Sequence, residues 1–93
     1  MRPAFVALIL VGACAQDSGT VMGVVTAVDG DLISVRSFTL LVEGDSMTFT
    51  PAEDGDFQYP LTHLRDHLRD GTPVRVSWER EADLYLAIAV GDP

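Results

Sequence analysis

A strict alternation of apolar and polar residues near the carboxyl end constrains the fold of this chain most. Every second residue is apolar over residues 73–79. Over residues 84–90 the large aliphatic residues also recur at every second position, in alternation with Tyr85, Ala87 and Ala89. A period of two belongs to strands, whose side chains point alternately to opposite faces of a sheet. The four residues between the two segments suffice for a hairpin turn. We therefore expect the chain to end in an antiparallel pair of strands.

A third strand is expected near the other end, at residues 20–28. This segment is dense in β-branched residues and has no helical period. Gly23 lies inside it, which predicts either a bulge or the close approach of a neighbouring backbone. Asp29 and Gly30 follow as a turn pair and end the strand.

The middle of the chain predicts two further strands. Val35 and Phe38 have opposite parity, so the inward face has to change between them, and a bulge near residues 36–37 would achieve this. Residues 38–43 and 47–50 then form a second hairpin. Residues 51–56 combine Pro, Gly and three carboxylates, which predicts a loop.

Residues 61–70 are the helical part of the sequence. Pro60 stands at the expected start and Gly71 just past the expected end. The stripe that would face the core contains Leu61, Leu64 and Leu68. The opposite, solvated side would carry His63, Asp66, His67 and Asp70.

The resulting order, β-β-β-α-β-β, resembles the OB-fold, a small five-stranded Greek-key barrel with a helix between strands three and four. The fold class is therefore mainly β, and closure would protect the strand edges. An SH3-like barrel or an open roll is the alternative. The expected core consists of Phe38, Phe49, Leu64, Leu68, Val76, Trp78 and Ile88.

Residues 1–13 read as an export signal, because Arg2 precedes an apolar run too short to span a bilayer. Residues 11–14, Val-Gly-Ala-Cys, resemble the lipobox of bacterial lipoproteins, which makes Cys14 the lipidation site. A lone thiol would be a liability in an oxidising compartment, and acylation removes it. The alternative is an ordinary signal peptide cleaved after a small residue such as Ala15.

On the lipoprotein interpretation, residues 14–19 form a lipidated tether and residues 20–93 form the barrel domain. Several acyl chains on one cysteine would give a stable membrane anchor. Lipoproteins with Asp directly after that cysteine tend to stay at the inner membrane, and this chain has Ala15 there. We therefore expect a lipid-anchored, extracytoplasmic protein, at the outer membrane if the source has two.

The charge excludes one large class of function. Six arginines oppose fourteen Asp and Glu, giving a net charge of -8, which is the wrong sign for gripping nucleic acid. The chain resembles small bacterial envelope lipoproteins with an OB-fold-like domain, through residues 23–30, 37–40, 60–68 and 73–76. The resemblance implies a location and a fold, and it implies no defined activity.

The most specific chemical feature is a pair of histidines four residues apart. His63 and His67 would lie one helical turn apart, a spacing that can hold Zn²⁺ or Cu²⁺, with Asp70 or Asp66 as a third ligand. The favoured interpretation of these residues is nevertheless an ordinary solvated helix face without a cofactor, and the metal site is the alternative. Arg75 and Tyr85, both outward by parity on adjacent strands, are the candidate contact patch.

Catalysis has little support in the sequence. No nucleophile elbow or zinc-protease motif occurs, and the acidic turns lack the spacing of a calcium loop. The favoured function is a non-enzymatic binding module for an envelope protein or a small molecule, without nucleic acid as a partner. The alternative is metal binding or metal buffering through the histidine pair, and the third possibility is a purely structural or surface-charge role.

Overall fold

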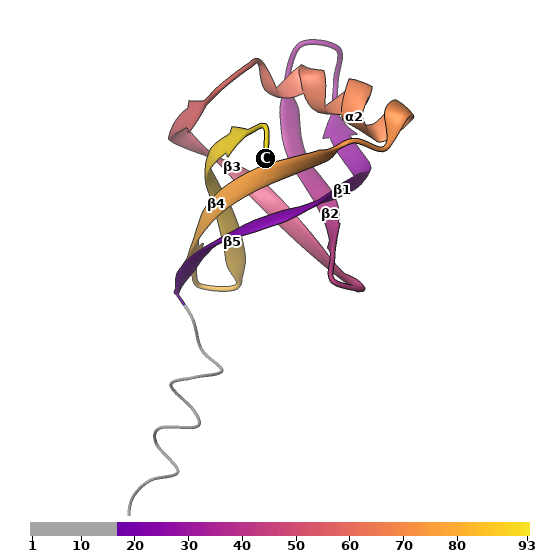
Figure 1. Cartoon of the computed structure of the whole chain (residues 1–93). Coiled ribbons are helices and arrows are strands. Elements are labelled where there is room, and N and C mark those ends of the chain that lie inside the picture. Colours follow the sequence, from indigo (N-terminus) through magenta and orange to yellow (C-terminus); the bar gives the residue numbers. More distant parts are fainter. Residues whose placement is uncertain (1–16) are drawn as a thin grey trace, which may run out of the picture.

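The computed structural model describes residues 17–93 of the chain. Five strands and one helical segment follow one another in the predicted order (Figure 1). The elements are β1 (Ser18–Gly30), β2 (Val35–Val42), β3 (Asp45–Phe57), the 3₁₀ turn η1 (Leu61–His63), α2 (Leu64–Asp70), β4 (Pro73–Glu81) and β5 (Leu84–Gly91).

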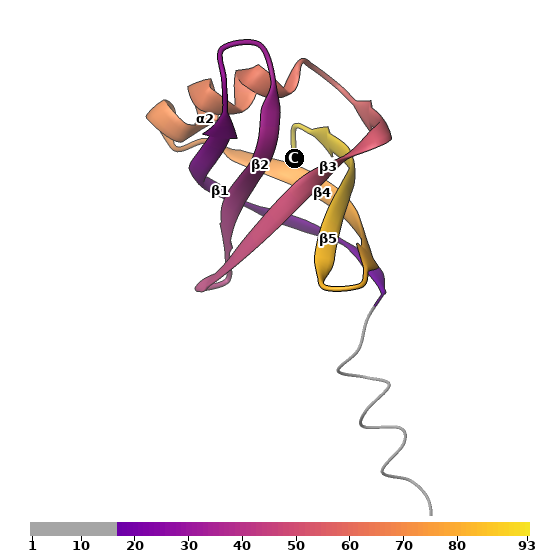
Figure 2. The same ribbon diagram turned by 180° about the vertical axis from the view of Figure 1, so that it is seen from behind.

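The strands close into a barrel in the order β1-β2-β3-β5-β4, with β4 returning to pair with β1 (Figure 2). β3 and β5 run parallel, and the other neighbouring strands run antiparallel. A five-stranded OB-like barrel with one short helix between β3 and β4 is therefore confirmed. The open roll is excluded, because every strand of the sheet has a neighbour on both sides.

Two expectations about β1 and β2 are confirmed. Asp29 pairs with Ser37 and Gly30 pairs with Val35, so Arg36 is the extra residue of a bulge that switches the inward face. Gly23 is a point of close backbone approach, because a Cβ there would lie 2.5 Å from the carbonyl oxygen of Leu41 on β2.

The predicted loop at residues 51–56 is wrong. These residues belong to β3, which pairs with β5 up to Pro51 and again from Asp56, with an irregular stretch between. A bulged strand tolerates Pro and Gly at positions that make no ladder hydrogen bond, so their presence does not end the strand.

Most of the expected core is confirmed, with two exceptions. Ten hydrophobic residues are buried: Val25, Phe38, Leu40, Phe49, Leu64, Val74, Val76, Trp78, Ala87 and Val90. Leu68 is 40% exposed, because the helical segment starts as a 3₁₀ turn and thereby turns His67 toward the barrel. Ile88 is half-buried, because it is the extra residue of a bulge opposite Ser77 and Trp78.

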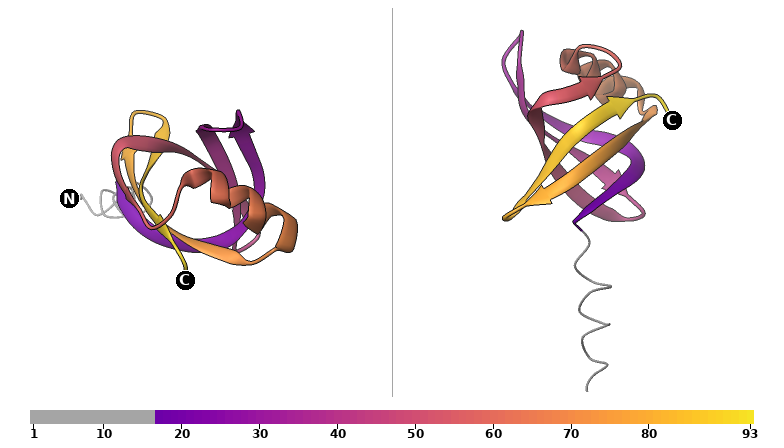
Figure 3. Two further views of the ribbon diagram at one scale, coloured as in Figure 1. Left: turned by 90° about the horizontal axis from the view of Figure 1, so that it is seen from above. Right: turned by 90° about the vertical axis from the view of Figure 1, so that its left-hand side faces the viewer.

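The helical segment lies over one end of the barrel, as the view from above shows (Figure 3). The loop between β1 and β2 lies at the same end, whereas the start of β1 and the turns after β2 and β4 lie at the other (Figures 1 and 2). Within the described residues, neither helical element is long and apolar enough to span a bilayer.

Candidate functional site

The structure brings the two histidines together at the helical end of the barrel. His63 is the last residue of η1 and His67 lies in α2, and their ring centroids are 5.0 Å apart in an edge-on arrangement. The His63 side chain is 45% exposed, whereas His67 is only 7% exposed. The expectation of two solvated imidazoles is therefore wrong for His67. This residue is buried in the barrel cover, our name for the helical segment of residues 61–70 that lies over one end of the barrel (Figure 3).

Each imidazole is held through its Nδ1 atom. Nδ1 of His63 lies 3.1 Å from the Oδ2 atom of Asp66, and Nδ1 of His67 lies 3.1 Å from the carbonyl oxygen of Thr72. The Thr72 hydroxyl also lies 2.7 Å from Nδ1 of His67. A carbonyl oxygen only accepts hydrogen bonds, so Nδ1 of His67 donates to Thr72, and in the neutral imidazole the lone pair lies on Nε2. The Asp66 carboxylate beside Nδ1 of His63 favours the same tautomer when that ring is neutral.

Tyr59 completes a three-ring cluster that the sequence analysis did not identify. Its ring centroid lies 4.5 Å from that of His63 and 5.8 Å from that of His67, and it stacks on His67 with an interplanar angle of 22°. Burial, and secondarily the negative charge of Asp92, raises the pKa of the Tyr59 phenol. Its hydroxyl is buried without a hydrogen-bond partner among the described residues. Tyr59 stands in a connecting segment, where no periodic pattern marks it.

The aspartates near the histidines have different roles. Oδ1 of Asp70 accepts hydrogen bonds from the Thr72 backbone amide at 3.0 Å and the Thr72 hydroxyl at 2.7 Å, and these bonds lower the pKa of Asp70. The Asp70 carboxylate therefore caps the turn that follows α2. It makes no contact with the imidazoles of the kind expected of a third metal ligand. Asp66 pairs with both His63 and Arg69. Within residues 17–93, no group of three or more His, Cys, Asp or Glu side chains is arranged to hold a metal.

The expected contact patch of Arg75 and Tyr85 does not form. Arg75 lies opposite Gly91, whereas Tyr85 lies opposite Arg80 at the far end of the same hairpin. The bulge in β5 reverses the parity of Tyr85, whose ring packs inward against Trp78 at a centroid distance of 5.0 Å. Cys14, the expected lipidation site, lies outside the described residues.

Two hollows open on the barrel surface. One of about 330 Å³ is lined by Asp56, Gln58, Arg75, Ser77, Ala89, Val90, Gly91 and Asp92. The other, of about 480 Å³, lies by the β2–β3 turn and is lined by Val42, Glu43, Asp45, Ser46, Met47 and Tyr85. Neither includes a member of the histidine pair, so the pair is a separate feature.

Comparisons with known proteins find solved structures that share this fold. No family model matches the chain, and no curated protein matches it in sequence. Among solved structures, Ag(I)-bound CusF is 14% identical, with a TM-score of 0.60, over 84% of this chain and 100% of that chain. A Cu(II)-bound tryptophan-to-alanine variant of Escherichia coli CusF is 16% identical, with a TM-score of 0.61, over 85% and 96% of the two chains. At these identities the likeness establishes the fold.

Proposed function

We propose that this chain is a non-enzymatic binding barrel of the cell envelope that holds a copper-class metal ion between His63 and His67. The observation that carries the proposal is that each Nδ1 atom faces an oxygen atom. Nδ1 of His67 hydrogen-bonds to the carbonyl oxygen of Thr72, and Nδ1 of His63 lies 3.1 Å from the carboxylate of Asp66. Histidines that bind metals commonly have this arrangement, because it fixes the tautomer and the ring orientation and makes Nε2 a better ligand.

The chemistry of two imidazoles favours copper among the common divalent ions. Imidazole suits Cu, Zn and Ni, and the Irving–Williams order places Cu²⁺ highest for a given nitrogen site. His67 is already fixed by packing and hydrogen bonds, whereas the half-exposed His63 gives an ion access from solvent. Because only two protein ligands are supplied, water would fill the other positions, and binding would be exchangeable. Exchangeable binding fits buffering or transfer of the ion.

The similar solved structures support this proposal at the level of the barrel. CusF, which shares the fold, has been solved with Ag(I) and with Cu(II). For the present chain, the ligands are inferred from its own helix. Tyr59 would shield one side of the pair, since its ring lies against both imidazoles.

Metal titration of the purified full-length chain tests the proposal. A Cys14→Ser background is required, because a free thiol would itself bind copper. We expect Cu(II) to bind with a stoichiometry of one. His63→Ala should weaken binding by at least about tenfold, because loss of only a hydrogen-bond partner of a metal ligand already costs about 10–100-fold in affinity. Arg65→Gln is the matched control, because it removes one arginine from the same helix whose hydrogen bond goes to the carbonyl oxygen of Asp31 and not to Asp66 or either imidazole. Equal affinities for the parent chain and His63→Ala would contradict the proposal.

We also propose that Cys14 anchors the barrel to a membrane by its lipid. The support is the sequence around Cys14 and the absence of any other cysteine in the chain. Mass spectrometry of the chain recovered from membranes should find an acylated residue 14 as the new amino terminus, and Cys14→Ser should release the protein from the membrane fraction. An unmodified thiol in an uncleaved chain would contradict the anchor and leave the metal proposal untouched.

A further inference from the structure

The loop between β1 and β2 presents two bare aliphatic side chains to solvent. Leu32 is 91% exposed and Ile33 is 89% exposed, the highest values among the large hydrophobic residues that the structure describes. The loop between β1 and β2 projects from the barrel at the end where the helix lies (Figure 1). A single exposed aliphatic residue is common on soluble domains, whereas two that are adjacent in sequence and both almost fully exposed are less usual. We call Leu32 and Ile33 the apolar tip.

Hydrogen bonds to one carboxylate hold the backbone of the apolar tip. Oδ1 of Asp31 accepts from the Ile33 amide at 3.0 Å, the Ser34 amide at 2.9 Å and the Ser34 hydroxyl at 3.0 Å. The Asp31 amide donates in turn to the Ser34 carbonyl oxygen at 3.0 Å. These contacts close a tight turn that displays Leu32 and Ile33 without covering them.

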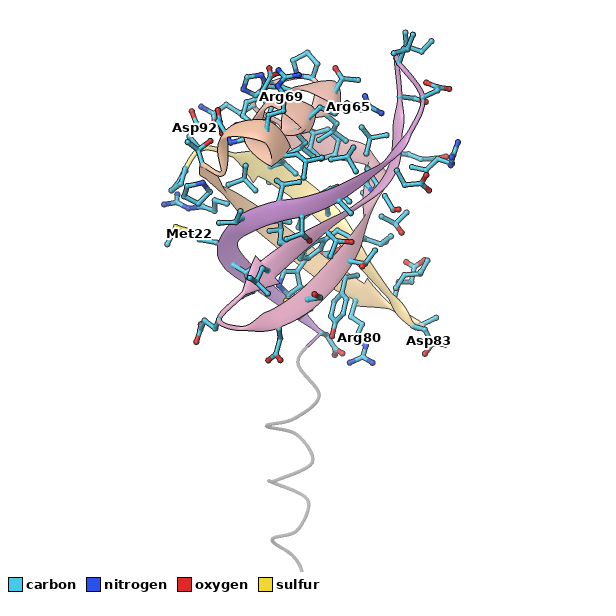
Figure 4. All side chains as sticks on the ribbon, turned by 90° about the vertical axis from the view of Figure 1, so that its right-hand side faces the viewer. Met22, Arg65, Arg69, Arg80, Asp83 and Asp92 are labelled. Carbon is cyan, nitrogen blue, oxygen red and sulfur yellow. The ribbon has the colours of Figure 1, made fainter. Side chains whose placement is uncertain are left out.

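Two arginines hold the base of the same loop. Arg36 pairs with Asp29 at 3.2 Å across the hairpin, and Nη2 of Arg65 donates to the Asp31 carbonyl oxygen at 2.7 Å. Arg65 belongs to α2 and lies at the helical end of the molecule, far from Arg80 and Asp83 (Figure 4). The apolar tip is thus tied to the barrel cover, and such preorganisation reduces the entropy lost on binding.

We propose that the apolar tip inserts into an apolar pocket of a partner protein whose surrounding surface is positively charged. Within residues 17–93 every strand of the closed barrel has a neighbour on both sides, which disfavours addition of a partner's strand to the sheet. Contact therefore has to be made by side chains. Leu32 and Ile33 have the highest exposed fractions of the large hydrophobic side chains that the structure describes, so the apolar tip is the best candidate for such a contact.

The net charge of the described residues favours one kind of partner for the apolar tip. The described residues carry all fourteen Asp and Glu and five of the six arginines, because Arg2 alone precedes them, and their net charge is 5 minus 14, or -9. At the base of the tip Asp29 and Asp31 are balanced by Arg36 and Arg65, so the selection rests on the net charge of the whole domain. That net negative charge opposes insertion into an anionic bilayer and docking of a second copy. A basic partner would instead be steered toward the barrel.

The apolar tip also lies away from the end where β1 begins (Figure 3). Ser18 and the turns after β2 and β4 occupy the opposite end of the barrel. A partner could therefore reach Leu32 and Ile33 whether or not the chain is anchored through its amino-terminal segment. The proposal does not depend on the metal site or on Cys14.

Site-specific photocrosslinking of the full-length chain in its native cells tests this inference. A benzophenone amino acid replaces Leu32, and in a control chain it replaces Leu84, which is 50% exposed at the opposite end. We expect one protein adduct from position 32 that is absent from position 84, identified by mass spectrometry. The identified protein is then purified and its affinity for the chain is measured at two salt concentrations.

The affinity should fall about 30-fold in Leu32→Ser, as for a hot-spot residue, and should decrease at higher salt, whereas Leu84→Ser should bind like the parent. Circular dichroism should show that Leu32→Ser folds, since its side chain makes almost no contact with the barrel. Equal affinity of the purified protein for the parent and Leu32→Ser would overturn the inference. So would the absence of a protein adduct, an adduct with a second copy, or one with lipid.

Discussion

Replacing Gly23 by alanine tests the packing of the barrel wall. A Cβ at this buried position would lie 2.5 Å from the carbonyl oxygen of Leu41 and 3.0 Å from a methyl group of Val42. The nearest atom is backbone within a closed barrel, so the clash is relieved only if β2 moves relative to β1. Overpacking of this kind costs roughly 1–3 kcal/mol, and we expect about 3 kcal/mol because ladder hydrogen bonds are displaced as well.

The loss is large for a domain of this size, whose total stability is of the order of 5–15 kcal/mol. Each kcal/mol corresponds to a shift of about 4–8 °C, so the Tm of Gly23→Ala should fall by about 12–24 °C. Thermal and urea unfolding followed by circular dichroism measure both quantities. Gly44→Ala is the control, since no atom lies within 4 Å of its Cβ and only the backbone strain at φ 91°, about 1 kcal/mol, remains. A Gly23→Ala chain at least as stable as Gly44→Ala would refute the close approach.

Two further predictions concern the helix and the apolar tip. Leu64→Ala should lower the free energy of unfolding by about 2–5 kcal/mol, as measured in urea, because Leu64 is fully buried. Leu68→Ala should lower it by less than about 1 kcal/mol. Equal losses in the two variants would contradict the observed helix rotation. Hydrogen bonds from Ile33 and Ser34 lower the pKa of Asp31, so its contribution to stability is present above the unfolded pKa and is lost as pH falls through the folded pKa. Asp31→Asn should therefore be less stable than the parent above about pH 4 and should match it in stronger acid; a deficit that stays constant across this range would contradict the assigned role.

The sequence predicted the parts of the fold that depend on unbroken local patterns. The order of strands, the bulge at Arg36 and the close approach at Gly23 all followed from parity or from a missing side chain. At residues 51–56 the error came from Pro and Gly, which favour a loop but here lie in an irregular stretch of β3. The other errors arose where a periodic pattern was interrupted without a local signal. One extra residue in β5, Ile88, reverses the face of Tyr85, and period-two reasoning has no means to locate it.

The helix shows the same limit at the candidate site. Counting at 3.6 residues per turn from Leu61 assigns Leu68 to the core and His67 to solvent. The first turn is 3₁₀, with about three residues per turn, so the face that meets the barrel is rotated and His67 is buried. The histidine spacing therefore identified the pair, but the hydrogen bond from His67 to Thr72 and the contact with Tyr59 depend on tertiary packing.

The central claim is that His63 and His67 bind one metal ion through Nε2, and nitrogen NMR of the imidazole rings tests it directly. The full-length ¹⁵N-labelled chain in the Cys14→Ser background is titrated with Zn(II), a diamagnetic ion that imidazole also binds. The proposal predicts that the Nε2 resonances of both histidines shift together to saturation while both Nδ1 resonances remain protonated. Unshifted Nε2 resonances, or a shift confined to one histidine, would contradict it.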